Sequence, residues 1–201
     1  MRKYLLSVAV FAAFAIAAAP AQAVTINPAG EAFTSFASNT VLSYGSGTVQ
    51  CDNAVANGTT ANPLSDVLTL SNVDFSAPCS TSTGHTVVSV VEDLNPAWTL
   101  KALTSTGNGN GTGVVNIPNG AGVTITTSGF LGNCKITVLG PQTAAGTLNS
   151  ALQTLQIDEA NLNANAVSTG STGCALTSND PTTGFKGTYA ITSTNDISIQ
   201  P

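Results

Sequence analysis

Histidine-dependent chemistry in this 201-residue chain would rest on His85, because the sequence contains one histidine. A Ser-His-Asp triad uses histidine as the general base between a nucleophile and an acid. The sequence lacks the G-x-S-x-G motif of many serine hydrolases, and Gly45-Ser46-Gly47 is one residue short of it. His85 instead begins an apolar, β-branched run, which favours a histidine at the exposed edge of a strand.

Two pairs of adjacent acids, Glu92-Asp93 and Asp158-Glu159, are the other candidates for chemistry. A glycosidase needs two carboxyl groups about 5 to 9.5 Å apart across a cleft. Neighbouring residues of a strand point to opposite faces, so neither pair forms that arrangement alone. Calcium would be bound by oxygen ligands, but the spacing of a calcium loop is missing, which favours solvated turns. We therefore expect no enzyme, no catalytic, metal-binding or cofactor-binding residues, and no cofactor.

The four cysteines, Cys51, Cys79, Cys134 and Cys174, favour disulfide bonds over a zinc site. No C-x-x-C pair is present, and a single histidine adds little to a set of zinc ligands. An even number of cysteines in an oxidising compartment indicates disulfides, and four cysteines allow three pairings. We favour Cys51–Cys79 with Cys134–Cys174, because sequential pairing makes each half of the chain a closed unit.

The first 23 residues predict a secretory signal peptide. Arg2 and Lys3 precede an apolar run over residues 4–19, and Ala21 and Ala23 occupy the positions that a signal peptidase reads. The run is short for a transmembrane anchor of about 20 residues. We expect cleavage after Ala23 and one β-rich domain over residues 24–201, which does not insert into a membrane. Its location would be the cell surface or the extracellular space, with the periplasm as the alternative.

The charge of the remaining chain excludes some classes of partner. Without Arg2 and Lys3 the formal net charge falls from −5 to −7, because all the acidic residues lie after the signal. Such a surface repels phosphate backbones and anionic lipid headgroups, so neither nucleic acid nor a membrane surface is an expected partner. The surface must consist largely of Ser, Thr, Asn, Gln and Gly, a composition common in extracellular bacterial domains.

Apolar and polar residues alternate through most of the chain, which is typical of half-buried strands. Segments rich in Gly, Asn and Pro at 57–58, 107–113, 118–120 and 179–181 predict turns. Strands at intervals of roughly ten residues indicate an all-β fold, either an antiparallel β-sandwich or a partly open barrel, with two disulfides. Strands are expected at residues 40–51, 67–75, 85–91, 98–103, 114–117, 123–127, 134–139, 185–190 and 196–199.

Residues 148–166 fit two different patterns. Four leucines between positions 148 and 162 have helical spacing, whereas residues 160–166 alternate strictly between apolar residues and asparagine. We favour two strands over one helix. A bulge or tight turn near Asp158-Glu159 would explain why the alternation changes phase there.

Several short motifs of this chain recur in outline in a group of small exported bacterial proteins. They are found at residues 25–28 (TINP), 49–51 (VQC), 75–79, 96–98 (PAW), 132–138 (GNCKITV), 173–174 and 185–189 (FKGTY). The chain resembles this group over nearly its whole mature length. Some members carry the label "protein activator of alkane oxidation", and most are uncharacterised. The resemblance implies a β fold, two disulfides and an extracellular location, and it supplies no catalytic residues.

Three functions are compatible with these features. The first is a secreted, non-catalytic domain with a structural or adhesive role at the cell surface or in the extracellular matrix. Its partners would be other copies of the chain or surface components. The alternative is a binder of a small apolar ligand such as an alkane or lipid, which requires a sizeable apolar cavity. The third is a hydrolase centred on His85.

Overall fold

The computed structural model describes residues 23–44, 47–76, 78–129, 132–162, 164–169 and 183–201. Over these residues the chain forms β-strands and turns and no helix, so the all-β prediction is confirmed. Residues 1–22 of the expected signal peptide and the expected turn at 179–181 lie outside the described residues. None of the described residues belongs to a helix long and apolar enough to cross a membrane.

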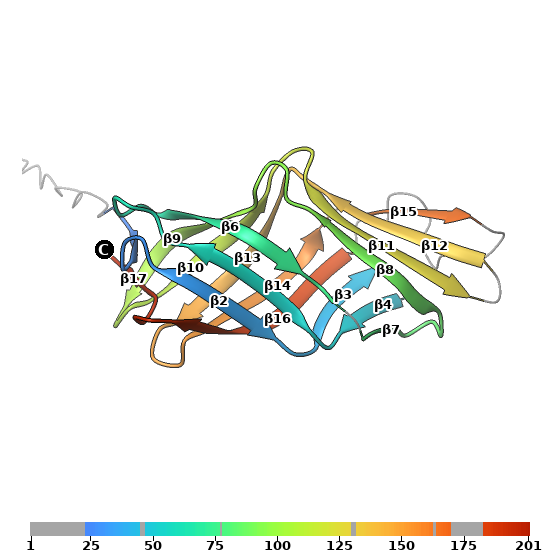
Figure 1. Ribbon diagram of the computed structural model, residues 1–201, viewed down its shortest axis with the longest axis horizontal. Helices are drawn as coiled ribbons and strands as arrows, with labels where there is room; N and C mark the ends of the chain where they lie inside the picture. Colours follow the sequence, from blue (N-terminus) through green and yellow to red (C-terminus); the bar gives the residue numbers. More distant parts are fainter. Residues whose placement is uncertain (1–22, 45–46, 77, 130–131, 163, 170–182) are drawn as a thin grey trace, which may run out of the picture.

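Eight strands close into an antiparallel barrel (Figure 1). Around the barrel their order is β14, β13, β10, β9, β6, β5, β2 and β16, and pairing of β16 with β14 completes the ring. The barrel is closed, whereas the sequence indicated a sandwich or a partly open barrel. The strands are β2 (Ala32–Ala37), β5 (Ala54–Thr59), β6 (Val67–Asp74), β9 (Thr99–Gly107), β10 (Asn110–Ile117), β13 (Gln142–Asn149), β14 (Thr154–Leu162) and β16 (Thr183–Ser193).

A second group of strands continues the same sheet beyond the barrel. It begins on β16, whose residues 184–186 pair with β3, while its residues 190–193 pair with β2 of the barrel. These strands lie in the right-hand part of Figure 1. In sheet order they are β3 (Thr40–Tyr44), β4 (Gly47–Cys51), β7 (Cys79–Thr81), β8 (Thr86–Asp93), β11 (Gly122–Gly129), β12 (Gly132–Leu139) and β15 (Ala164–Thr169).

A two-stranded sheet covers one end of the barrel. It pairs β1 (Thr25–Asn27) with β17 (Ser198–Gln200), and Ile26 lies directly opposite Ile199. Both isoleucines are almost fully buried and belong to the core of the barrel. We call this sheet the end cap. Its backbone joins the barrel through the Ile199 amide, which donates to the Gly109 carbonyl at 2.8 Å.

The buried side chains form two adjacent clusters. The first fills the barrel, and the second lies under β3, β4, β11 and β12 and includes Cys51 and Ile136. Phe75, Val123 and Phe185 pack against both clusters. The rings of Phe75 and Phe185 meet edge to face, with centroids 5.7 Å apart, a favoured geometry for aromatic pairs. The two parts of the sheet therefore share one continuous apolar interior.

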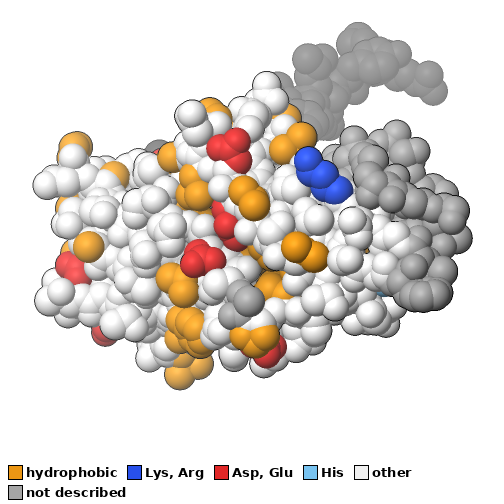
Figure 2. Space-filling model, turned by 45° about the vertical axis from the view of Figure 1, so that its right-hand side comes forward, with side chains coloured by type: hydrophobic (Ala, Val, Ile, Leu, Met, Phe, Trp, Pro, Cys, Tyr) orange, Lys and Arg blue, Asp and Glu red, His pale blue; other side chains and the backbone are white. Residues whose placement is uncertain are grey.

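The outer surface carries few charges. On the face drawn in Figure 2, most side chains are neither charged nor hydrophobic, as the composition leads one to expect. Lys186 Nζ lies 3.0 Å from Asp158 Oδ1, and Lys101 Nζ lies 3.6 Å from Asp66 Oδ2. Both pairs are well exposed, so each contributes about 1 kcal/mol or less to stability.

Most of the expected strands are found close to their expected positions. Residues 67–75 and 134–139 correspond to β6 and β12. Of the turn expected over 107–113, only the start is found, because β10 already begins at Asn110. The turn joins β9 to β10, and Gly107, Asn108 and Gly109 have the positive φ values that glycine and asparagine tolerate best.

Two local predictions are wrong. Residues 40–51 form not one strand but the paired strands β3 and β4. Asn57-Gly58 is not a turn, because it lies inside β5 opposite Phe33 of β2. A Cβ on Gly58 would lie 2.7 Å from Cζ of Phe33, so the phenylalanine ring covers this glycine within the sheet.

The strand prediction for residues 148–166 is confirmed. They contain the end of β13, a turn, and then β14 and β15. The register between β14 and β16 shifts between Glu159 and Leu162, close to the bulge expected at Asp158-Glu159. The two strands β14 and β15 follow each other in sequence but pair with different partners, β13 and β16 for the first and β12 for the second.

The Cys51–Cys79 disulfide is confirmed, and it joins directly opposite residues of β4 and β7. Cys134 is buried in the second cluster. Its expected partner Cys174 lies outside the described residues, so this second pairing stays a prediction.

Replacing both Cys51 and Cys79 by alanine should lower the free energy of unfolding by about 3.5 kcal/mol. The bond closes a 28-residue loop, and its loss restores chain entropy to the unfolded state. Urea unfolding of the variant and of the oxidised wild type measures the difference. A variant within about 1 kcal/mol of the wild type would contradict this estimate.

Candidate functional site

A cavity of about 140 Å³ lies in the apolar interior. It spans both clusters, because its walls come from the barrel strands, the end cap and the second group of strands. Its walls include Leu68, Leu70, Trp98, Val115, Leu148 and Ile157 on the barrel side, and Val49, Val90, Ile125 and Val138 on the other side. The apolar-ligand hypothesis requires a cavity of this kind.

The cavity exists because several inward positions carry very small side chains. An eight-stranded barrel has an interior that side chains can just fill, so small residues there leave space. Gly113 of β10 lies directly opposite Gly146 of β13, and Val115 lies opposite Ala144. All four residues line the cavity. Where β10 and β13 form the wall, much of its surface is therefore made by backbone atoms and short side chains.

The polar side chains in the wall are mostly engaged with the backbone. Ser35 Oγ donates to the Ala56 carbonyl at 2.9 Å, and Thr40 Oγ1 donates to the Cys51 carbonyl at 3.2 Å. Trp98 Nε1 donates to the Asp93 carbonyl at 3.0 Å. No described residue lining the cavity carries a charge. A molecule inside would therefore meet a neutral and nearly apolar surface.

The end cap covers the cavity at one end with Ile26 and Ile199, and Ile197, the residue before β17, also lines it. Gln153 holds this cap through its side-chain amide. Its Oε1 accepts from the Ile197 amide at 2.9 Å, and its Nε2 donates to the Ile197 carbonyl at 3.0 Å. Both hydrogen-bonding groups of Ile197 are thereby paired, as a neighbouring strand would pair them.

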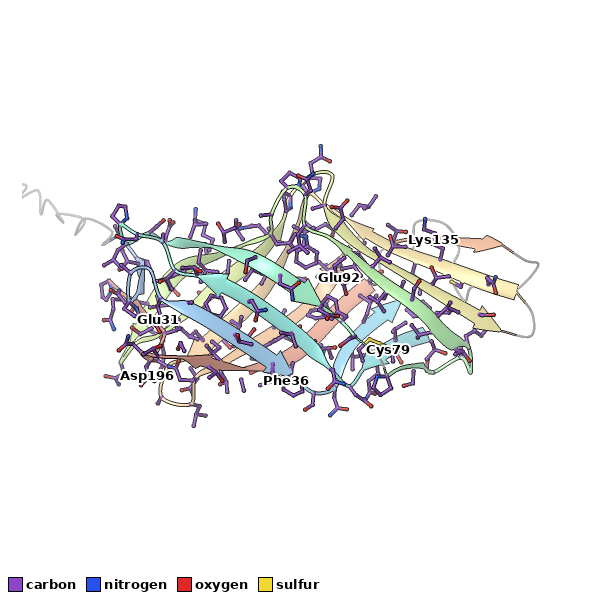
Figure 3. All side chains as sticks on the ribbon, in the orientation of Figure 1. Glu31, Phe36, Cys79, Glu92, Lys135 and Asp196 are labelled. Atoms are coloured by element: carbon purple, nitrogen blue, oxygen red, sulfur yellow. A yellow bond between two sulfur atoms is a disulfide. The ribbon has the colours of Figure 1, made fainter. Side chains whose placement is uncertain are left out.

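Glu31 fixes the loop that leads from β16 to the cap. Its carboxylate accepts hydrogen bonds from the backbone amides of Thr194 and Asn195, at 2.6 and 3.0 Å, and from Asn195 Nδ2 at 3.0 Å. Figure 3 shows Glu31 and Asp196 at the capped end of the barrel. The hydrogen bonds from Asn195 hold the pKa of Glu31 below its ordinary value, because they favour the ionised carboxylate.

His85 lies just before β8, and the described residues around it form no Ser-His-Asp triad. Its ring covers Gly129, where a Cβ would lie 2.8 Å from the ring, and its Nδ1 lies 3.4 Å from Thr127 Oγ1. No carboxylate among the described residues is hydrogen-bonded to it. Ser46 of the incomplete serine motif is outside the described residues.

Both carboxylates of the acid pair Glu92-Asp93 accept hydrogen bonds from backbone amides. Glu92 Oε1, near the middle of Figure 3, accepts from the Phe75 amide at 2.8 Å. Asp93 Oδ1 accepts from the Asn95 amide at 2.9 Å, which shapes the turn before Trp98. These carboxylates do not face each other across a cleft, so the structure gives them a local, stabilising role.

The pair Asp158-Glu159 has similar partners. Asp158 forms the exposed ion pair with Lys186, its register partner on β16. Glu159 accepts from the Asn161 amide at 2.9 Å and from the Ala145 amide at 3.3 Å, beside the register shift in β14. Among the described residues no three His, Cys, Asp or Glu side chains are grouped in a way that could hold a metal ion.

No protein-family model, curated protein or solved structure matches this chain. The resemblance to small exported bacterial proteins therefore stays a prediction.

The residues that create the cavity were not predicted from the sequence. Ala144, Gly146 and Ala56 lie on strands that were not predicted, because small side chains at inward positions weaken the alternation that reveals a strand. A usable signal is present in residues 142–149, where Ala144, Gly146 and Leu148 occupy every second position.

Stability at acid pH should depend on Glu31. Because its pKa is lowered in the folded state, its contribution is present above the ordinary value of 4.5 and is lost as the pH falls through the lower, folded pKa. Urea unfolding as a function of pH measures this effect. A Glu31→Gln variant should lose less stability than the wild type on acidification below 4.5. Identical pH profiles for the two proteins would contradict the assignment.

Proposed function

We propose that this protein is a non-catalytic binder of a small, neutral, apolar molecule, which it holds inside the barrel. The observation that carries this proposal is the apolar cavity of about 140 Å³. An engineered protein cavity of about 150 Å³ lined by apolar side chains stays free of water and binds benzene or xenon. The expected ligand is therefore about the size of benzene or a short alkane, and not a long-chain lipid.

The energetic penalty of the empty cavity supports a function for it. Cavity volume costs about 24 cal/mol per Å³, so an unfilled space of 140 Å³ lowers stability by roughly 3 kcal/mol. This is a large fraction of the total stability of a typical domain, about 5 to 15 kcal/mol. A single larger side chain at position 144 would remove much of the space. A ligand that fills the cavity would recover the lost contacts.

We also propose that the protein acts after export, at the cell surface or outside the cell. The Cys51–Cys79 disulfide supports this location, because such bonds persist mainly in oxidising compartments. The sparse charge of the outer surface fits the same environment. A structural or adhesive role remains the other hypothesis, but such a role gives no reason for a hollow interior.

Filling the cavity tests the binding function. In Ala144→Leu, three added carbon atoms would occupy space that the ligand needs, since Ala144 lines the cavity. Benzene should stabilise the wild type against thermal unfolding in a concentration-dependent way, by about 2.7 kcal/mol at one hundred times its Kd. In Ala144→Leu, the affinity should fall at least about tenfold, a change of about 1.4 kcal/mol.

Ala145→Leu is the matched control, because Ala145 is the next residue of β13 and is exposed on the opposite face. It should bind benzene like the wild type. The proposal is wrong if benzene, toluene and cyclohexane all fail to stabilise the wild type. It is also wrong if Ala144→Leu and Ala145→Leu bind them equally well.

A further inference from the structure

One hydrogen-bond donor in the cavity wall has no partner among the residues that the structure describes. Four described lining residues carry a side-chain donor: Ser35, Thr40, Trp98 and Tyr189. The first three donate to backbone carbonyls. The Tyr189 hydroxyl is hydrogen-bonded to no described residue, although the side chain is almost completely buried. Buried hydroxyl groups normally have a partner, so this exception requires an explanation.

The local structure makes room for the Tyr189 ring in the interior. Phe185, Gly187, Tyr189 and Ile191 alternate along the inward face of β16. The tyrosine ring leans over Gly187, because a Cβ at this glycine would lie only 3.0 Å from Cε2 of the ring and 3.0 Å from Cγ2 of Thr40. The absence of a side chain at position 187 therefore allows the ring to lie along the cavity wall.

The surroundings of Tyr189 restrict the chemistry of any partner. Burial raises the pKa of this hydroxyl, because the charged phenolate would be poorly solvated, so the group stays neutral and can donate a proton. The described lining residues carry no charge that could balance a carboxylate or an ammonium group. An ionised ligand such as a fatty-acid anion would lose its hydration without compensation.

We propose that the ligand is an apolar molecule with one neutral oxygen, which accepts a hydrogen bond from the Tyr189 hydroxyl. Ketones, aldehydes, ethers and alcohols of benzene-like size belong to this class. This inference rests on the proposed function and specifies its ligand. A hydrocarbon of the same shape fits the cavity but leaves the tyrosine unpaired. An oxygenated ligand pairs with it and is held in one orientation.

A cycle of two proteins and two ligands tests the inference. Cyclohexanone and methylenecyclohexane have nearly the same shape and differ by an oxygen in place of a methylene group. Their affinities for the wild type and for Tyr189→Phe are measured by isothermal titration calorimetry or by ligand-induced shifts in Tm. The different hydration of the two ligands cancels when their affinity ratio is compared between the two proteins.

In the wild type, the ratio of ketone affinity to alkene affinity should be about tenfold higher than in Tyr189→Phe, as expected for one neutral hydrogen bond. Most of this change should come from a lower affinity of Tyr189→Phe for the ketone. The alkene should bind Tyr189→Phe at least as well as it binds the wild type. A ratio that changes less than twofold would overturn the inference while leaving the proposed function intact. If neither ligand binds the wild type, both proposals fail.

Tyr44→Phe is the matched control. Tyr44 is also buried, but it lies in the second cluster, is not among the residues lining the cavity, and has a hydrogen bond with Thr83. Its removal should leave the affinity ratio unchanged. Without ligand, Tyr189→Phe should unfold at the same urea concentration as the wild type or a higher one, because the hydroxyl that it lacks is unpaired. A clear loss of stability would show that Tyr189 has a partner within the protein and would contradict the inference.

Discussion

The pairing of β16 with β14 closes the barrel, and the rest of the structure depends on it. One edge of β16 follows β14 from Thr183 to Ala190, while its other edge is divided between β3 and β2. A strand shared in this way leaves the barrel without a free edge and also starts the second group of strands. Its inward residue Tyr189 then lies in the cluster that fills the barrel. Phe185 packs against both clusters and contacts Phe75. The shared strand β16 thus accounts for the closed barrel, for the continuous interior and for the position of the buried tyrosine.

Closure also explains why the interior is hollow. The circumference of an eight-stranded barrel is set by its backbone, so the volume inside changes little when inward side chains become smaller. Where Gly113 faces Gly146 and Val115 faces Ala144, the wall cannot move inward to fill the space, because both strands are held by neighbours on each side. The end cap with Ile26 and Ile199 covers this space at one end. A neutral cavity follows, with the Tyr189 hydroxyl as its unpaired donor among the described residues.

The sequence predicted strands well where a large apolar residue marks every inward position. In β6 and β12, Leu68 and Leu70, or Ile136 and Val138, are separated by outward polar residues and are buried as expected. The strand prediction failed where the inward residues are small, as in β5 and β13. Asn57-Gly58 has the composition of a turn and lies within a strand, because the ring of Phe33 covers the glycine from the neighbouring strand. No local pattern contains that information.

The sequence by itself determined the all-β class, most strand positions and the scarcity of surface charge, and it favoured the Cys51–Cys79 pair among three possible pairings. These properties follow from local alternation, composition and spacing along the chain. Only the tertiary structure decided that the barrel closes, that β16 is shared, and that small residues from separate strands meet around one cavity. The physical reason is that backbone hydrogen bonds between strands are the same for nearly every residue type. The choice of partners, such as Ser193 with Phe33, depends on how the whole set of side chains can be buried together.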